Sequence, residues 1–505
     1  MLLSILVFCP LLFALILAMV GSARWIRPTA LVFSLVEFVL SLVMLAQFDA
    51  STPALQMVER YPWITRFGVT YFLGLDGLSL WLVLLTTFLM PIVVVASWKS
   101  IEDRVKAFHC SLFVLQTAMI GTFLALDAVF FYFFWELSLV PMYLIIGIWG
   151  GPRRIYATVK FFIYTMIGSV LMLLAMIYLL HQTGEQLGTV SASLLDFYKL
   201  HIPFVVGRFL TPQSLLFWAF VLAFAIKIPM FPFHTWLPDA HVEAPTPGSV
   251  ILAAVMLKMG TYGFLRWVLP MFPDAVAAYS WFFFFVGSVG IIYGALVAMV
   301  QPDIKKLVAY SSVSHMGYVI VGLFALNELG VTGGLFQMLN HGVSTGALFL
   351  LVGMIYERTH SREISKYGGL ASVLPLFSIF FFLITLSSIA VPLTNGFVGE
   401  FLILLGTFKS NVWAGAASVF GVILGAAYML WMFKRVFFGK EGELVSDKAH
   451  PLKDLNWREI AVMVPLVILV FWMGIFPGHF LNMSRASISH LIENKENYQL
   501  AIQGE

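Results

Sequence analysis

The sequence has few cysteines and few charged residues. Only two of its 505 residues are cysteines, Cys9 and Cys110, and both lie in or beside apolar stretches. A disulfide framework, a thiolate metal site and a redox cofactor held by cysteine are therefore excluded. Charged residues make up 11% of the chain, against about a quarter in a soluble domain, whereas hydrophobic residues make up 60%. This balance predicts a polytopic helical membrane protein.

Several binding motifs are also missing. The chain has no phosphate-binding P-loop, no glycine-rich dinucleotide motif between a strand and a helix, and no His/Cys spacing typical of a metal site. The net charge of +3 comes from lysines and arginines in connections, without a dense basic cluster. We therefore expect the chain to bind no nucleotide, flavin, metal or nucleic acid directly.

Apolar stretches long enough to cross about 30 Å of hydrocarbon recur along the whole chain. They predict an all-α polytopic membrane protein of about fourteen transmembrane helices. The lysines and arginines are concentrated in the odd-numbered connections, which predicts that both termini lie on the non-cytoplasmic side. The predicted helices start near Leu2, Ala30, Leu78, Phe108, Ala128, Ala157, Leu215, Gly248, Ala278, Ile304, Gly333, Leu374, Ala414 and Ile460.

The stretch from residue 221 to residue 267 contains a lysine in each of two apolar segments, Lys227 and Lys258. A lysine near the middle of a membrane costs about 2.5–3.5 kcal/mol on insertion scales, so its retention indicates a function. Pro229 and Pro232 follow Lys227 and predict a break in that helix. Lipid cannot satisfy the freed backbone groups, so the break must face protein or a water-filled cavity.

A second interrupted span is predicted at residues 387–406, where Pro392 and Gly396 precede Glu400. The two breaks, in predicted helices seven and twelve, are five helices apart, and an odd offset turns the second copy upside down. We therefore expect two inverted five-helix repeats, at residues 108–268 and 277–438. Residues 1–107 would supply three N-terminal helices, and residues 439–505 a cytoplasmic loop, a last helix and a tail.

Few titratable side chains lie at membrane depth, and a row of such groups is typical of a proton relay. Burial generally lowers the pKa of a lysine and raises that of a carboxyl, which brings both toward the working pH. A static salt bridge between two candidates, or histidines hydrogen-bonded in the core, would be the structural alternatives. No partner for the second lysine or the second glutamate is evident. The candidates are Glu136, Lys227, Lys258 and Glu400, with His315 and His341 as weaker ones.

Other polar residues have simpler explanations. His234 and His241 belong to the connection FPFHTWLPDAHVEAP, which also contains Asp239 and Glu243, and a structured turn needs such side chains. Asp76, Asp127 and Asp303 stand near helix ends where solvent is expected. We assign these residues no role from sequence.

The polar motifs resemble one family. FFWELSLVPMYLI, AIKIPMFPFHTWLPDAHVEAPTPGSVILAAVMLKMGTYGFLRW, DIKKLVAYSSVSHMGY, NHGVSTGALFL and NGFVGEF resemble the antiporter-like membrane subunits of proton-pumping NADH:quinone oxidoreductase, respiratory complex I. The resemblance runs from about Trp63 to Lys440 and implies fourteen helices, inverted repeats and one proton channel.

The resemblance also implies roles for the candidate residues. Glu136 matches an ion-pair glutamate, and Lys227 matches its lysine partner. Lys258 matches the central lysine of helix eight. Glu400 matches the terminal glutamate of helix twelve, where sibling chains of the same enzyme carry lysine. His315 and His341 match histidines of a polar axis.

The expected function is proton translocation in the bacterial cytoplasmic membrane, driven by electron transfer in other subunits. NADH, FMN, iron–sulfur clusters and quinone would be bound by partner subunits, and the partners would include peripheral subunits, neighbouring antiporter-like chains and lipid. The alternatives are a subunit of a multi-subunit cation/proton antiporter or of a membrane-bound hydrogenase, and a passive membrane scaffold.

Overall fold

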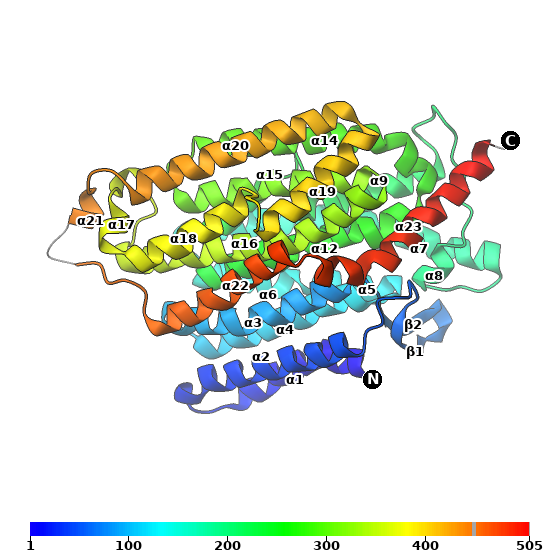
Figure 1. The fold of residues 1–505 in the computed structure, drawn as a ribbon. Coiled ribbons are helices and arrows are strands. Elements are labelled where there is room, and N and C mark those ends of the chain that lie inside the picture. Colours follow the sequence, from blue (N-terminus) through cyan, green and yellow to red (C-terminus); the bar gives the residue numbers. More distant parts are fainter. Residues whose placement is uncertain (447–450, 504–505) are drawn as a thin grey trace.

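The computed structural model describes residues 1–446 and 451–503, with side chains of the last helix described as far as residue 493. The chain forms a bundle of long helices that run along one common direction (Figure 1). Within the described ranges, twelve helical segments are long and apolar enough to cross a membrane. They are α1 (Leu2–Met19), α2 (Ala23–Ala46), α3 (Leu80–Ser100), α4 (Val105–Leu124), the pair α5 (Ala128–Leu137) and α6 (Leu139–Trp149), α7 (Arg154–Leu187), the segment from α11 (Thr246–Ile251) to α13 (Leu269–Met271), α14 (Pro273–Met299), α15 (Ile304–Phe324), α16 (Glu328–Thr359), α20 (Val412–Phe437) and α22 (Trp457–Ile475).

The predicted class, a polytopic helical membrane protein, is confirmed, while the count of about fourteen spans stays a prediction. Two further apolar helices, α9 (Pro212–Lys227) and α18 (Pro375–Ser388), are shorter than the twelve. The remaining helical segments are α8 (Leu194–Phe197), α10 (Trp236–Glu243), α17 (Leu370–Val373), α19 (Asn395–Ser410), α21 (Glu443–Ser446), α23 (Gly478–Gln503) and the short 3-10 turns η1 (Thr65–Phe67) and η4 (Ile364–Lys366).

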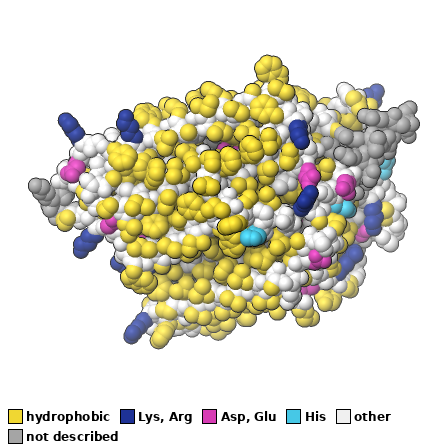
Figure 2. All heavy atoms as spheres, viewed as in Figure 1, with side chains coloured by type: hydrophobic (Ala, Val, Ile, Leu, Met, Phe, Trp, Pro, Cys, Tyr) yellow, Lys and Arg dark blue, Asp and Glu magenta, His cyan; other side chains and the backbone are white. Residues whose placement is uncertain are grey.

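The outer surface of the bundle is apolar in the middle and charged at both ends. Figure 2 shows hydrophobic side chains over the central part of this face, with lysine, arginine, aspartate and glutamate gathered toward its two ends. Large apolar side chains such as Trp281, Phe285 and Ile423 are more than half exposed. A soluble protein rarely exposes so large a contiguous apolar surface, and lipid is the solvent that fits it.

The first predicted break is present. Helix α9 ends at Lys227 and α10 begins only at Trp236. The indole nitrogen of Trp236 donates a hydrogen bond of 2.8 Å to the carbonyl of Ile226. A backbone group freed by the break is thus satisfied inside the protein, as the absence of water in a bilayer requires.

The second predicted break lies between α18, which ends at Ser388, and α19, which begins at Asn395. The hydroxyl of Ser387 donates to Oδ1 of Asn395 at 2.6 Å, so a side-chain contact joins the two sides of the break. Ser344 of α16 contacts the same hydroxyl at 2.6 Å. The interrupted backbone therefore faces polar groups of the bundle rather than lipid.

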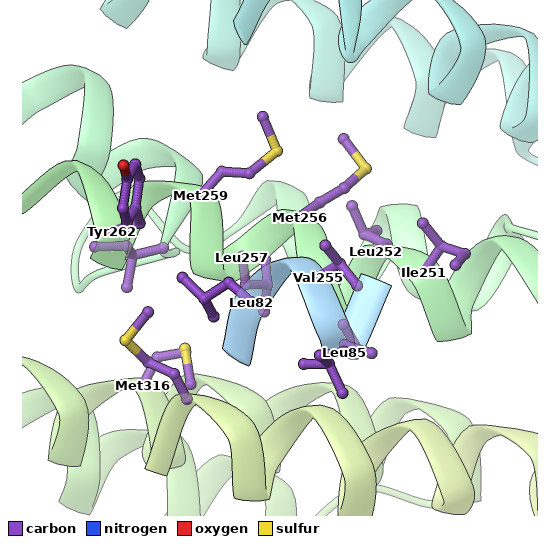
Figure 3. Close-up of a cluster of buried hydrophobic side chains, with 14 of the residues drawn as sticks. Leu82, Leu85, Ile251, Leu252, Val255, Met256, Leu257, Met259, Tyr262 and Met316 are labelled. Carbon is purple, nitrogen blue, oxygen red and sulfur yellow. The ribbon is translucent and has the colours of Figure 1, made fainter. Parts of the chain in front are cut away.

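The helix that carries the second lysine lies in the centre of the bundle. Its middle turn, α12 (Leu257–Gly263), stands between two π-helical turns, η2 (Leu252–Met256) and η3 (Phe264–Val268). Such π-helical turns inside α-helices frequently occur at functional sites. Figure 3 shows Leu82, Leu85 and Met316 from neighbouring helices packed beside this segment. The most apolar part of the whole span is completely buried.

The sequence did not predict the one sheet of the described chain. Strands β1 (Gln56–Ile64) and β2 (Val69–Leu75) form an antiparallel hairpin between α2 and α3. Glu59 of β1 accepts a backbone hydrogen bond of 2.9 Å from Leu3 and one from the hydroxyl of Ser4. Burial opposes the charged form of Glu59, but these hydrogen bonds and the nearby N-terminal amine hold its pKa below the ordinary value. The hairpin thereby anchors the start of α1.

Candidate functional site

Lys258 lies at the centre of the site and is fully buried. Its ammonium nitrogen donates to the backbone carbonyl of Ala253 at 2.5 Å and lies 2.6 Å from Nδ1 of His341. Because a protonated lysine can only donate, Nδ1 of His341 is the acceptor in this contact. No partner for Lys258 was evident from the sequence, and the partner is a residue 83 positions further along the chain.

Two histidines continue the row from Lys258. The ring centroids of His341 on α16 and His315 on α15 are 5.8 Å apart. Nδ1 of His315 lies 3.2 Å from Oε1 of Glu400 on α19. The approach lacks the direction of a good hydrogen bond, so it is an ion-pair contact that depends on protonation of the ring. Four titratable side chains from four helical segments thus lie next to one another in one buried row.

Glu400 has a second, neutral partner that sequence reasoning missed. Gln337 donates to its Oε1 at 3.0 Å, and Asn340 donates to Oε1 of Gln337 at 2.9 Å. Both amides lie on α16 within one turn of His341, and this spacing along FQMLNH was the available signal. Gly399 permits the approach, since a Cβ atom there would lie 2.5 Å from the side chains of both amides.

A small polar cavity adjoins the row. Its volume of about 10 Å³ is close to the space that one water molecule occupies. Nε2 of His341 is buried without a hydrogen-bond partner within the described structure. The cavity wall is lined by His315, Gln337, Asn340, His341, Ser344, Thr345, Ser387, Ser388 and Gly396.

Lys227, the last residue of α9, is also buried. Its ammonium nitrogen donates to the hydroxyl of Ser138 at 3.1 Å and lies 4.9 Å from the centre of the Trp135 ring. Glu136 interacts with it electrostatically, but among the described residues the two form no direct salt bridge. One carboxyl oxygen of Glu136 is buried without a hydrogen-bond partner in the described chain. Glu136 and Lys227, the predicted pair, are therefore neighbours, and the hydrogen bond of the lysine goes to Ser138.

The two lysines lie on helices that touch. A Cβ atom on Gly260 of α12 would lie 2.7 Å from a side-chain carbon of Ile228 and 2.9 Å from the carbonyl of Phe224 on α9. Lys227 precedes Ile228 directly, and Lys258 is two residues before Gly260. The close glycine contact therefore brings the helix of Lys227 against the helix of Lys258.

Some polar residues lie deeper than the sequence indicated. Asp76 was expected near solvent, yet it is buried and forms an ion pair with Arg266 at 2.5 Å. Lys305 is buried and donates to the carbonyl of Ala244 at 2.6 Å. His241 is buried and its ring lies on that of Phe349 with centroids 4.6 Å apart. Helix ends that look exposed in sequence are here covered by neighbouring helices.

The described residues contain no group of three or more His, Cys, Asp or Glu side chains placed to hold a metal ion. The polar side chains of the site form hydrogen bonds and ion-pair contacts with one another instead.

The interrupted helices and the buried row define the class of antiporter-like membrane proteins. The family of NADH:quinone oxidoreductase/Mrp antiporter transmembrane proteins matches residues 125–425, and the amino-terminal family of NADH-ubiquinone oxidoreductase chain 4 matches residues 2–126. NADH-quinone oxidoreductase subunit M of Rhodobacter capsulatus is 49% identical over 98% of this chain and 96% of its own length. The chain therefore belongs to the family of NADH-quinone oxidoreductase subunit M, or chain 4.

Solved structures agree with this membership. A chain of respiratory complex I from Thermus thermophilus has a TM-score of 0.86 at 31% identity, with 97% of this chain and 100% of that chain covered. A chain of the Mrp complex from Dietzia sp. has a TM-score of 0.84 at 20% identity, over 98% and 99% of the two chains. The second likeness shows a shared fold alone.

Proposed function

We propose that the chain translocates protons across the membrane as a subunit of NADH:quinone oxidoreductase. One observation supports this most strongly: the buried row of neighbouring titratable side chains, Lys258, His341, His315 and Glu400. Titratable groups are costly inside a membrane and are retained in ion and proton pathways. NADH, FMN, iron–sulfur clusters and quinone would be bound by other subunits, which supply the driving electron transfer.

Proton transfer would proceed between neighbouring groups of the row. The contact of 2.6 Å between Lys258 and Nδ1 of His341 is short enough for a proton to pass along it. His341 would release the proton from its other ring nitrogen toward His315, through a water molecule in the adjoining cavity. A protonated His315 attracts the carboxylate of Glu400, which would accept the proton and lead it to the membrane surface or to a neighbouring subunit.

Lys227 and Glu136 would control the supply of protons to Lys258. The carboxylate of Glu136 would attract the ammonium of Lys227, and this attraction would weaken if the two side chains moved apart, which would help the lysine to release its proton. Ser138 offers the ammonium an oxygen acceptor at 3.1 Å, so the lysine can stay buried in either arrangement. The α9–α12 contact at Gly260 would link this pair to the row.

The two five-helix repeats at residues 108–268 and 277–438 remain part of the proposal. In support, each unit contains a helix that stops inside the bundle and resumes after a break, at Lys227 and at Ser388. The first unit would contribute Glu136, Lys227 and Lys258, and the second would contribute the histidines and Glu400. Residues 1–107 and 439–505 would flank the repeats.

The membrane is proposed to be the bacterial cytoplasmic membrane, with both termini on its outer side. The excess of lysine and arginine in the odd-numbered connections supports this orientation, and the start of α1 and the end of α23 lie toward the same end of the bundle (Figure 1). A Val206→Cys variant places a thiol at a side chain that is 84% exposed. We expect it to react with an impermeant maleimide in intact cells; reaction only in inverted vesicles would reverse the orientation.

The proposed partners are the membrane and peripheral subunits of the enzyme, including neighbouring antiporter-like chains, and membrane lipid. The matching family model also covers Mrp antiporters, which favours one alternative, a subunit of a cation/proton antiporter. Copurification separates the two functions. Flavin and iron–sulfur subunits in the purified assembly indicate the oxidoreductase, whereas an assembly of membrane chains alone would indicate the antiporter.

A Glu136 series tests the proposed function against a purely structural role. Glu136→Ala removes the charge beside Lys227 and should nearly abolish proton pumping and coupled quinone reduction in proteoliposomes. Glu136→Asp keeps the charge and should spare much of both activities. Normal pumping by the assembled alanine variant would contradict the role of Glu136 and would favour a passive scaffold.

A further inference from the structure

One buried carboxyl group lies outside the row described above. Glu37 stands in the middle of α2, and its exposed fraction is 0%. Both of its carboxyl oxygens are buried without a hydrogen-bond partner among the described residues. Neighbouring residues of α2 such as Val36 and Val39 are exposed on the apolar surface. Glu37 therefore points into the protein from a helix that otherwise faces lipid. It lies in an apolar span but is not among the candidate residues predicted from the sequence.

A layer of three aromatic rings shows which residues of α1 and α4 lie at the same level as Glu37. The ring centroid of Phe13 on α1 lies 4.3 Å from that of Phe33 on α2 and 6.0 Å from that of Phe113 on α4. Successive spans run in opposite directions, so α2 and α4 run parallel while α1 runs opposite (Figure 1). One turn from this layer, in the same direction, α1 presents Cys9 and α2 presents Glu37.

On α4, the same turn presents Gln116 and Thr117. Both side chains are buried, and within the described chain neither amide atom of Gln116 nor the hydroxyl of Thr117 has a hydrogen-bond partner. Buried polar groups are nearly always paired, so unpaired ones on two facing helices need an explanation. One turn beyond Glu37 along α2, the hydroxyl of Ser41 forms a hydrogen bond of 2.7 Å with the hydroxyl of Thr87 on α3.

The charges around Glu37 restrict what the carboxyl can bind. Of the titratable groups on the helices packed against α2, the thiol of Cys9 is the one that interacts with it in the described structure. The other cationic or titratable side chains of these helices lie near helix ends, away from Glu37. They include Arg27 near the start of α2, Lys99 near the end of α3, and Lys106 and His109 near the start of α4. Arg27 is ten residues from Glu37, or about 15 Å along the helix axis. Among the described residues, no cation is therefore placed to balance an ionised carboxylate at this depth.

We propose that Glu37 is a second proton-binding site of this chain, which holds one proton among helices α1, α2 and α4 and apart from the row that contains Lys258. A proton neutralises the carboxyl without a counter-ion, and the protonated group gains a donor for which Gln116 and Thr117 supply oxygen acceptors. Gln116 in turn has an amide donor for the other carboxyl oxygen. The proposal does not depend on proton transfer through the row.

Infrared difference spectroscopy on the purified complex tests the proposal. At neutral pH, the wild-type complex should show a carbonyl band of a protonated carboxylic acid that shifts in heavy water and is lost in Glu37→Gln. Glu328→Gln is the matched control, because Glu328 is exposed and faces Arg485 at 3.5 Å, so the same band should remain. An identical band in wild type and Glu37→Gln overturns the proposal. Loss of the wild-type band on addition of sodium ions at fixed pH also overturns the proposal, because a bound cation would then replace the proton.

A measurement on the wild-type complex covers the case in which Glu37→Gln fails to assemble. A lipid-soluble carbodiimide reacts with a protonated carboxyl: the proton goes to one nitrogen, the carboxyl oxygen bonds to the central carbon, and the acyl group then moves to a nitrogen as a stable acylurea. Mass spectrometry should find this adduct at Glu37, in an amount that falls as the pH is raised. An unmodified Glu37 after complete reaction overturns the proposal.

Discussion

Replacement of His341 with glutamine interrupts the row at its shortest contact. His341 accepts from Lys258 at 2.6 Å and faces the ring of His315 at a centroid distance of 5.8 Å. Glutamine fits a buried helical position, but its amide does not take up and release a proton at working pH, so Lys258 loses its contact with a proton acceptor. The variant should therefore assemble normally and lose proton transfer between Lys258 and His315.

The size of the effect follows from the contact that is lost. A hydrogen bond to a charged group contributes about 1.5–3 kcal/mol, and about 1.4 kcal/mol corresponds to a factor of ten. A proton that leaves Lys258 without this acceptor meets a barrier higher by at least that amount. We therefore expect proton translocation to fall about 10- to 150-fold, and quinone reduction coupled to it to fall with it.

The assay measures proton uptake and quinone reduction together in proteoliposomes that contain the purified complex. His109→Gln is the matched control, since His109 is likewise buried in a membrane helix but bonds to the local carbonyl of Val105 at 2.8 Å. It should pump at the wild-type rate. Wild-type pumping by an assembled His341→Gln complex would refute the relay through His341.

Three further predictions concern packing and charge. Gly260→Val inserts a side chain where even a Cβ atom would lie only 2.7 Å from a side-chain carbon of Ile228, so stability should fall by about 1–3 kcal/mol; an unchanged unfolding temperature in detergent would contradict the close helix contact. Asp76→Ala leaves Arg266 buried without its partner, at a cost of about 3–5 kcal/mol, and the double variant with Arg266→Met should recover part of it in the same unfolding assay. The pKa of Glu59 is lowered in the folded chain, so its stabilisation is present above the ordinary glutamate pKa and disappears as the pH falls through the lowered value. Hydrogen-exchange protection of the first amides of α1 should decrease in acid, and constant protection would argue against this anchor.

The sequence predicted the residues of the site better than their partners. Lys227, Lys258 and Glu400 stand out because a charge inside an apolar span is costly, and this cost can be read from the chain alone. The broken helices were predictable for a similar reason, since proline removes a backbone donor where lipid offers no replacement. The contact between Lys258 and His341 joins residues 83 positions apart and depends on how α12 packs against α16.

Other features were missed because they depend on packing. Gln337 reaches Glu400 only because Gly399 lets α16 and α19 approach closely. The hairpin β1–β2 lies in a connection that a search for apolar runs passes over. Asp76 looked solvent-exposed in sequence, whereas neighbouring helices cover it and supply Arg266.

The most direct test of proton transfer through the buried row is the number of protons translocated per electron pair in complexes that carry Lys258→Met. Methionine keeps the length and apolar stem of the side chain but cannot hold a proton. Lys409→Met, at an exposed position of α19, controls for the loss of a positive charge. With the two complexes assembled equally, the account predicts wild-type pumping for Lys409→Met and a loss of proton translocation for Lys258→Met. Wild-type proton stoichiometry and rate in Lys258→Met would contradict it.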